Sequence, residues 1–399
     1  MISLLTFGKT IYNKIPNRLR FIFLPVKFII RLVNITRRDI WIINGEETAS
    51  KQKLAIIYAG TEENKNYLIN SIFDGSAKES YIGETWLWNI SKVAAGKDNG
   101  CSLMVTEFNK NFRIFFKRGK CFFIPYWIVG EVDISADISF FTRNKSLASD
   151  LRRIRKNNLN FELTNELSQF NNFYHNMYIP HITKIHGNGV VLMKYDFMKR
   201  EFKNCDLLLV KNGKDYIAGM LLAYTKQKVR LWSLGVKDGN SDYVRDGAIG
   251  ALFYFAVNYL QEKGYKTVNF GASRAFLKDG VLQYKKKWGI KIIGTFKKGF
   301  LVKPLSVTAG LKEFLLNNPF IYMDKCGFNS AVFIENPEAL SKKDMEKLYK
   351  DYYLTGVSKL FIYCFGGNNI KRQEIVPPEL SDRITIHSAE SFLKNSLGS

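Results

Sequence analysis

Apolar and polar residues alternate along the first part of the chain in a way that predicts several elements. Residues 54–58 form a continuous apolar run, which is typical of a buried strand, and residues 62–72 after it have a helical pattern. Three further apolar runs at 102–108, 112–117 and 121–134 are separated by short polar turns. These elements predict a first α/β unit that contains an antiparallel meander.

A basic stretch follows, in which Leu147, Leu151 and Ile154 recur at helical spacing. We place the boundary between two units within this stretch, at 148/149. A second helix is predicted over 166–178, and Pro180 is expected to stop it because proline lacks an N–H.

The next third of the chain predicts a second unit. Strands are expected at 206–211, 216–225 and 229–236, followed by a helix over 246–262 that ends at Gly264. A strand at 267–270 and a strand pair at 290–295 and 299–302 complete the unit. This order lacks the strict βαβ alternation of a dinucleotide-binding domain, and it predicts an α/β (α+β) fold with mixed, largely antiparallel sheets flanked by helices.

The expected organisation has four parts. They are a basic amphipathic N-terminal segment (1–46), an N-terminal α/β unit (47–148), a second unit (149–303) and a C-terminal extension (304–399). For the extension we predict helices near 311–316 and 341–353, a strand at 360–365 and a polar C-terminus, and no functional role.

The chain is strongly basic, with 59 Lys and Arg residues against 36 Asp and Glu residues, a formal charge of +23. Such a charge favours polyanionic partners: nucleic acid, an anionic membrane surface or a phosphate-rich cofactor. A lysine-rich genome is the plain alternative. Between residues 14 and 38 basic residues stand among Phe, Ile, Leu and Val, which fits either an interfacial segment on lipid or a helix on the protein core.

The remaining composition argues against disulfides, metals and membrane spans. The five cysteines are scattered, which is typical of reduced thiols in the cytosol, and His175, His181 and His186 lack the spacing of a metal site. No uncharged apolar run reaches 18 residues, so no transmembrane helix is expected. We expect a cytoplasmic protein, peripheral on the inner face of the membrane if the basic segment binds lipid.

The most informative stretch is TVNFGASRAFLKDGVLQYKKKWG at 267–289. It resembles the signature of the GNAT-like acyltransferases related to the Fem peptidyl and aminoacyl transferases, in the polysaccharide-biosynthesis acetyltransferase branch. The resemblance extends with decreasing clarity over about 149–302. It implies tandem GNAT-like units and an active site in the second of them.

Residues of this stretch have the chemistry of a ligand site. Gly271 allows a sharp turn after the strand, and Ser273 and Arg274 follow with a hydroxyl and a forked cation, unless they only cap the turn and face solvent. Asp279 either caps the next helix or orients and deprotonates an amine. The candidate catalytic residues are therefore Asp279, Tyr284 and Ser273, and the candidate substrate-binding residues are Arg274, Lys285 and Trp288. Core packing is the alternative for Tyr284 and Trp288, and solvated charge for Lys285.

A second site element is expected at the start of the 246–262 helix, because unpaired N–H groups and the helix dipole favour an anion there. The resemblance implies a pyrophosphate-binding loop at 245–250, although the first glycine stands one place early and Asp246 adds a negative charge. Backbone donors of the 229–236 strand would polarise an acyl carbonyl. The candidate cofactor-binding residues are Ser233, Gly235, Arg245, Gly247 and Gly250.

The resemblance implies an N-acyltransferase that uses acetyl-CoA or another acyl-CoA as co-substrate and no metal. Its acceptor is expected to be a primary amine, on an amino sugar or a lipid-linked glycan precursor of the cell envelope. One alternative is a Fem-like transferase that takes an aminoacyl group from charged tRNA, which the basic charge favours. Another is a non-catalytic GNAT scaffold bound to the membrane surface.

Overall fold

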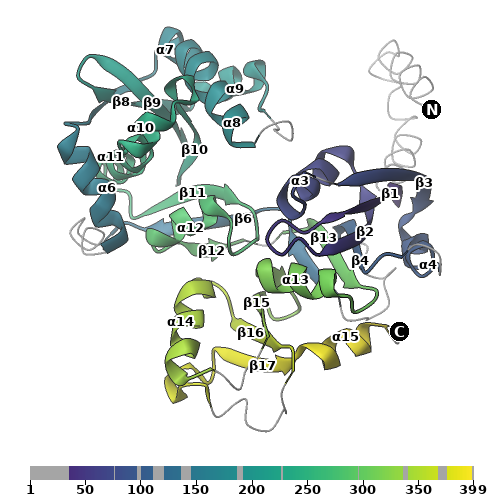
Figure 1. Cartoon of the computed structure of the whole chain (residues 1–399). Helices are drawn as coiled ribbons and strands as arrows, with labels where there is room; N and C mark the ends of the chain where they lie inside the picture. Colours follow the sequence, from purple (N-terminus) through teal and green to yellow (C-terminus); the bar gives the residue numbers. More distant parts are fainter. Residues whose placement is uncertain are drawn as a thin grey trace, which may run out of the picture.

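The computed structural model describes residues 36–75, 77–96, 100–110, 121–135, 145–186, 192–225, 228–294, 296–335, 340–366 and 375–397. Their strands form three sheets, of six, seven and four strands, with helices packed on them (Figure 1). The α/β fold class with mixed sheets flanked by helices is confirmed. The basic segment up to residue 35 and the run at 112–117 lie outside the described residues. No helix among those described is long and apolar enough to cross a membrane.

The first sheet has the strand order β3-β1-β2-β4-β13-β5. Only the β2–β4 pair is parallel. Helix α3 (Glu62–Ile72) has the bounds expected from its apolar spacing, and it is followed after β3 by a 3-10 turn and by α4 (Ile90–Ala94). The strand bounds are β1 Arg37–Glu46, β2 Lys53–Gly60, β3 Lys78–Trp86, β4 Leu103–Asn109, β5 Phe122–Pro125 and β13 Lys298–Pro304.

The second sheet has the order β12-β6-β11-β10-β9-β8-β7, and only β10 and β11 run parallel. The strands expected at 206–211, 216–225 and 229–236 are confirmed as β8, β9 and β10. The bounds are β6 Ile128–Asp133, β7 Asn160–Thr164, β8 Cys205–Asn212, β9 Asp215–Tyr224, β10 Val229–Val236, β11 Thr267–Ser273 and β12 Lys291–Ile293.

The first two sheets exchange strands. Only Tyr126 and Trp127 separate β5 in the first sheet from β6 in the second. Strand β13 returns from the second unit and lies between β4 and β5, antiparallel to both. The predicted meander of the first unit is therefore wrong: the 121–134 run divides between two sheets, and β13 occupies the place between β4 and β5. Their apolar patterns fit any partner, and the partner comes from far along the chain.

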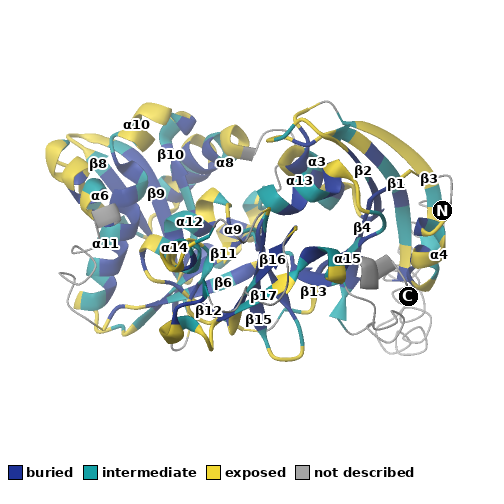
Figure 2. Ribbon diagram, turned by 60° about the horizontal axis from the view of Figure 1, so that its bottom comes forward, coloured by how far each residue is buried: buried dark blue, intermediate teal, exposed yellow. Residues whose placement is uncertain are grey.

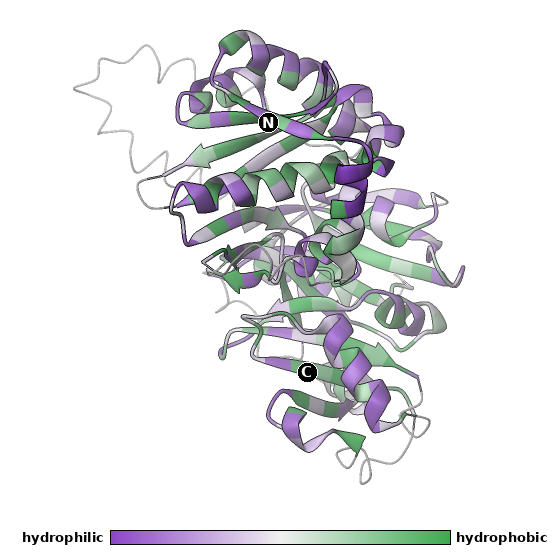
Figure 3. Cartoon of the chain, turned by 90° about the vertical axis from the view of Figure 1, so that its left-hand side faces the viewer, coloured by the Kyte–Doolittle hydropathy of each residue, from purple (hydrophilic) through white to green (hydrophobic). Residues whose placement is uncertain are grey.

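Helices cover both faces of the second sheet. Successive side chains of β8 therefore pack alternately against the helices on one face and on the other. Leu207 and Leu209 pack under α7 and the helical turns after it, whereas Leu208 and Val210 belong to the core under α11. The helices are α6 Lys145–Lys156, α7 Leu167–Asn172, a π-helix Phe173–Tyr178, α8 Ile179–His186, α9 Tyr195–Phe202, α10 Ser241–Arg245, α11 Ala248–Glu262 and α12 Gly280–Lys287. Their hydrophobic and hydrophilic stripes are visible in Figure 3.

The expectation that Pro180 ends a helix is wrong. Pro180 is the second residue of α8, which continues directly from the π-helix. A proline inside a helical run removes one N–H donor and strains the turn before it, and here that turn is a π-helix rather than a regular α-helix. The helical run therefore passes through three segments, and its wider π-turn lies against β10.

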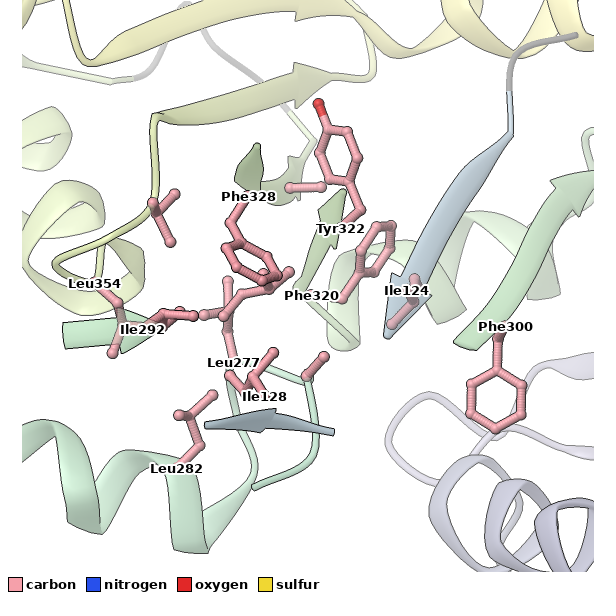
Figure 4. Packing of buried hydrophobic residues seen from close by; sticks show 14 of the residues in the cluster. Ile124, Ile128, Leu277, Leu282, Ile292, Phe300, Phe320, Tyr322, Phe328 and Leu354 are labelled. Atoms are coloured by element: carbon pink, nitrogen blue, oxygen red, sulfur yellow. The ribbon is translucent and has the colours of Figure 1, made fainter. Parts of the chain in front are cut away.

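The C-terminal extension forms a third sheet, in the order β14-β15-β16-β17. The expected helices and strand are confirmed as α13, α14 and β16, while β17 and α15 stand where we expected a polar terminus. Phe122 of β5 contacts the rings of Phe320, Phe333 and Phe392, so this sheet shares a core with the first. Figure 4 shows Phe320 and Tyr322 of β14 beside Ile124 of β5. The bounds are α13 Ala309–Asn317, β14 Phe320–Met323, β15 Phe328–Ile334, α14 Lys342–Tyr352, β16 Lys359–Cys364, β17 Ile384–Ser388 and α15 Ala389–Leu397.

Candidate functional site

Strands β10 and β11 part shortly after they begin to pair. They share two register positions, Val229 with Val268 and Arg230 with Asn269. Directly beyond them, the pairing of β10 with β9 shifts between Leu231 and Leu234, and the pairing of β11 with β6 shifts between Asn269 and Ala272. Two bulges at the same level turn the strands away from each other. We call the resulting gap in the ladder, flanked by residues 231–235 and 270–273, the split.

Gly271 forms the base of the split. Its φ of +73° is a left-handed conformation that favours glycine, and a Cβ there would lie 2.9 Å from the carbonyl oxygen of Leu231. The Asn269 side chain accepts a hydrogen bond from the Gly271 N–H at 2.7 Å and fixes the turn. The turn expected at Gly271 from the sequence is therefore present, and it is part of β11 itself.

Two serines flank the split, one on each strand. Ser233 and Ser273 are 8% and 3% exposed, and neither Oγ has a hydrogen-bond partner among the described residues. A buried hydroxyl without a partner costs free energy and calls for an explanation. Thr106 of β4 also has an unpartnered buried hydroxyl. The distinctive feature is thus the position of both serines where backbone pairing stops.

Lys285 of α12 lies beside the same gap. Its side chain is buried, and its Nζ donates a hydrogen bond to the carbonyl oxygen of Ala272 at 2.7 Å. Nζ is also 3.9 Å from the point where a Cβ of Gly271 would stand. Burial lowers the pKa of Lys285 to about 8, against the opposing effect of the Asp279 carboxylate. Lys285 is therefore a buried amine, not the solvated lysine of the alternative interpretation.

Asp279 caps α12. Its Oδ1 accepts a hydrogen bond from the N–H of Leu282 at 2.9 Å, as the capping interpretation of the sequence predicted. Its charge also acts on Lys285 and Arg274. A role in orienting or deprotonating an amine stays a prediction.

Arg274 leaves the split and points to the first unit. Its guanidinium lies between two aromatic rings, 3.6 Å from the centroid of Tyr67 in α3 and 4.0 Å from that of Trp127 in the β5–β6 turn. Burial lowers the pKa of Arg274, and nearby Tyr67 and Asp279 oppose this. The aromatic partners lie in other parts of the sequence, and no local pattern indicated them.

Tyr284 and Trp288 share the face of α12 that their spacing predicted, and this face packs toward α6 and α11. The Tyr284 hydroxyl donates to Asp150 Oδ2 at 3.3 Å, and burial together with that carboxylate raises the pKa of Tyr284. Trp288 is 3% exposed and packs near the rings of Phe253 and Phe270. Both contacts fit the packing alternative, and a role for either residue in the reaction stays a prediction.

Two glycines of the 245–250 segment, Gly247 and Gly250, are covered by α6. Gly247 is the left-handed N-cap of α11, and a Cβ there would lie 2.9 Å from Cβ of Arg153. A Cβ at Gly250 would lie 2.8 Å from Cβ of Asp150. The Asp150 carboxylate thus stands beside the first turn of α11, where the resemblance implies a pyrophosphate.

Arg245 and Gly235 have different surroundings. Arg245 lies in α10, which has no buried residue (Figure 2), and it forms an exposed ion pair with Asp242 at 2.7 Å. A Cβ at Gly235 would collide with the backbone of Met177 and Tyr178 in the π-helix. Close packing of that helix on β10 is enough to explain this glycine. Binding of a cofactor by either residue stays a prediction.

The sequence-predicted residues thus fall into separate groups. The structure brings Ser233, Ser273 and Lys285 to the split, places Asp279 and Arg274 just after it, and turns Tyr284, Trp288 and the 245–250 segment toward α6. Sequence reasoning missed Tyr67, Trp127 and Asp150. Among the residues that the structure describes, no three His, Cys, Asp or Glu side chains come close enough to hold a metal ion.

No protein-family model matches the chain, and no curated protein matches it in sequence. Solved structures do match. A C-terminal domain assigned to lysylphosphatidylglycerol synthetase from Agrobacterium fabrum is 15% identical, with a TM-score of 0.32 over 66% of this chain and 80% of that chain. FemX is 12% identical, with a TM-score of 0.33 over 66% of this chain and 84% of that chain.

A GCN5-related N-acetyltransferase from Sphaerobacter thermophilus is 9% identical, with a TM-score of 0.29 over 64% of this chain and 75% of that chain. The structures similar to this chain therefore include GNAT-type and Fem-type proteins, the two groups named by the resemblance of residues 267–289.

Proposed function

We propose that this chain is an acyltransferase whose reaction takes place at the split between β10 and β11. The observation that carries the proposal is the parting of two parallel strands at coincident bulges, with a buried, unpartnered serine hydroxyl on each side. Parted strands leave backbone N–H and C=O groups without the partners that a continuous ladder would supply. A ligand with its own amides and carbonyl can take the place of the missing strand.

The proposed reaction joins an acyl group to a primary amine. The amine loses a proton, its nitrogen attacks the carbonyl carbon of the acyl donor, and donors on β10 stabilise the developing oxyanion. The new C–N bond forms, the bond to the leaving group breaks, and the leaving group takes up a proton. No covalent enzyme intermediate is needed.

Each residue around the split has a proposed part in this step. Ser233 and Ser273 donate to or accept from the bound donor, and Asp279 or a water molecule takes the proton of the amine. Lys285, a buried cation that neutralises with a pKa of about 8, holds the Ala272 carbonyl and favours the negative charge of the transition state. Acyl-CoA is the proposed donor. The proposed acceptor is the amine of an envelope glycan precursor that is made at the inner face of the membrane.

One observation favours a second donor, an aminoacyl ester of tRNA. The Asp150 carboxylate stands beside the start of α11 and would oppose a pyrophosphate bound to that helix, although an ion pair with Arg153 at 3.6 Å reduces this repulsion. A tRNA donor does not require an anion at that position, and the charge of +23 suits it.

Thermal unfolding with and without ligand tests the proposal, because a ligand that binds only the folded state raises the midpoint. We expect acetyl-CoA, a longer acyl-CoA or charged tRNA to raise the unfolding midpoint. In the Ser273→Ala variant the rise should be smaller, and the apparent affinity for the donor calculated from it should fall at least threefold. Thr106→Val is the matched control, since it removes another buried, unpartnered hydroxyl in the first sheet. A rise with none of the donors, or an equal loss in both variants, would exclude the split as the donor site.

A further inference from the structure

The guanidinium of Arg274 is held in place by the first unit, and it is not neutralised there. Its two flanking rings come from α3 and from the β5–β6 turn, so the two units build this position together. Among the ion pairs of the described residues none includes Arg274, and its buried Nη1 has no hydrogen-bond partner. Planar stacking on both faces fixes the fork of donors and leaves its edge for a ligand.

Charged residues of both signs follow Arg274 along one short stretch of chain, with Lys278 directly before Asp279. Asp279 stands five residues after Arg274, caps α12, and acts electrostatically on both Arg274 and Lys285. Glu63 of α3 acts on Arg274 as well, without being an ion-pair partner. The ligand edge of the site thus presents a fixed cation, Arg274, followed by a fixed anion, Asp279.

We propose that Arg274 and Asp279 form the acceptor subsite, which binds a compound carrying both an ammonium and an oxyanion group. The oxyanion pairs with the Arg274 fork, and the ammonium lies toward Asp279 and the split. This inference rests on the proposed function, because it identifies the chemical class of the amine that is acylated. A bidentate contact with carboxylate or phosphate is the geometry that guanidinium favours.

The position of Trp127 is consistent with access to this subsite. The Trp127 side chain is 47% exposed although it lies against a half-buried arginine. Tyr67 on the other side is partly buried, and desolvation raises its pKa. Trp127 is therefore the outer wall of the subsite.

Three small probes separate the two charges of the acceptor: phosphoethanolamine, which has both groups, inorganic phosphate and ethanolamine. We expect phosphoethanolamine to raise the unfolding midpoint of the full chain most, phosphate less and ethanolamine least. In Arg274→Gln the apparent affinities for phosphoethanolamine and for phosphate should both fall at least tenfold. In Asp279→Asn, which keeps a capping side chain, phosphoethanolamine should bind no better than phosphate.

Arg200→Gln is the matched control, because Arg200 also lies over an aromatic ring, that of Phe197, but is exposed at the surface of α9. Its response to the three probes should equal that of the unchanged protein. Sedimentation with phosphatidylethanolamine vesicles then distinguishes a lipid headgroup from a soluble amine, since only the former would carry the protein down in an Arg274-dependent way.

Equal responses of Arg274→Gln and the unchanged protein to phosphoethanolamine would overturn the inference, provided that both unfold at the same midpoint without ligand. If Arg274→Gln has a lower unfolding midpoint without ligand, Arg274→Lys is used in its place. This variant retains the charge and loses the stacked fork. An unchanged affinity of Arg274→Lys for phosphoethanolamine would also overturn the inference. Binding of acyl donors to the split is measured separately, so failure here leaves the proposed function standing.

Discussion

The first and second sheets each contain a buried polar centre, and the two centres differ in how well their hydrogen bonds are satisfied. In the first, Oε1 of Glu107 accepts from the Tyr58 hydroxyl, the Thr61 N–H and hydroxyl, and the Asn64 amide, at 2.5–3.0 Å. In the second, Ser233 and Ser273 have no partner at all among the described residues. A satisfied network stabilises the fold, whereas the two unpartnered hydroxyls are where the proposed ligand would supply hydrogen bonds.

The pKa of Glu107 shows the strength of the first centre. Burial alone would raise it, but the hydrogen bonds from Thr61, Asn64 and Tyr58 outweigh burial, and the pKa lies below its usual value. A carboxylate with a depressed folded pKa contributes stability above its unfolded pKa and loses it as the pH falls through the folded value. This centre therefore supports the fold at neutral pH and weakens in acid.

Glu107→Ala should give the largest loss of stability. It leaves several buried donors without an acceptor, at a cost of about 3 kcal/mol or more in the free energy of unfolding, measured by urea unfolding at pH 7. Glu107→Gln, which retains an acceptor oxygen, should lose less, and its stability should fall less steeply than that of the unchanged protein as the pH drops below about 4.5. Equal acid sensitivity in both would remove Glu107 from the account of the first centre.

Gly271→Ala should come next. The new Cβ would meet the Leu231 carbonyl at the base of the split, and the alanine would have to adopt a left-handed backbone conformation. We therefore expect the free energy of unfolding to fall by about 2 kcal/mol or more and most acyl transfer to be lost. Gly264→Ala is the control: its φ is +81°, and a Cβ there meets nothing within 4 Å. The difference between the two variants isolates the contact in the split, and equal losses would show that the split itself is insensitive to a methyl group.

Lys285→Met tests the buried amine through pH. The folded pKa of about 8 is below the usual 10.5, so the unfolded chain binds more protons between these values and stability should rise with pH there, by up to about 1.4 kcal/mol per pH unit. In Lys285→Met the rise should become smaller but persist in part, because burial also lowers the pKa of Lys286 to about 8. Urea unfolding at pH 7.5, 8.5 and 9.5 measures the difference, and turnover should fall. Lys287→Met, an exposed lysine of the same helix, should retain both the rise and the turnover.

Asp150→Asn should have the smallest effect, and it distinguishes the two acyl donors. Asparagine can still accept the hydrogen bond of Tyr284, but the negative charge beside α11 is gone. If a pyrophosphate binds there, acyl-CoA affinity should rise about twofold to fivefold, from a helix-terminus effect of about 0.5–1 kcal/mol. An unchanged affinity for acyl-CoA, together with donor binding by tRNA, would favour the aminoacyl donor.

Elements with strong local patterns could be predicted from the sequence. The bounds of α3 and β10 agree with prediction because a helical or continuous apolar spacing and clear turn residues mark them. The place of β13 between β4 and β5 could not be predicted, since the choice of strand partner depends on distant segments. The C-terminal β17 and α15 were missed because their apolar residues are few and spaced among polar ones.

The candidate site divides in the same way. Ser273, Asp279 and Lys285 belong to one contiguous stretch, and the expected turn and cap are where the sequence placed them. The position of Arg274 depends on its contacts with Tyr67 and Trp127, and Gly250 in the 245–250 segment packs against Asp150. These contacts join residues more than about 90 positions apart, and no spacing within a single stretch of chain encodes them.

The exchange of strands between the first two sheets has a consequence for how the molecule unfolds. Strand β6 comes from before the 148/149 boundary and lies between β12 and β11 in the sheet that holds the split, while β13 comes from beyond the boundary and lies between β4 and β5 in the other sheet. Cleavage at that boundary, followed by separation of the pieces, would strip a strand from each. The two halves therefore depend on each other for cooperativity, and their melting should merge into one transition.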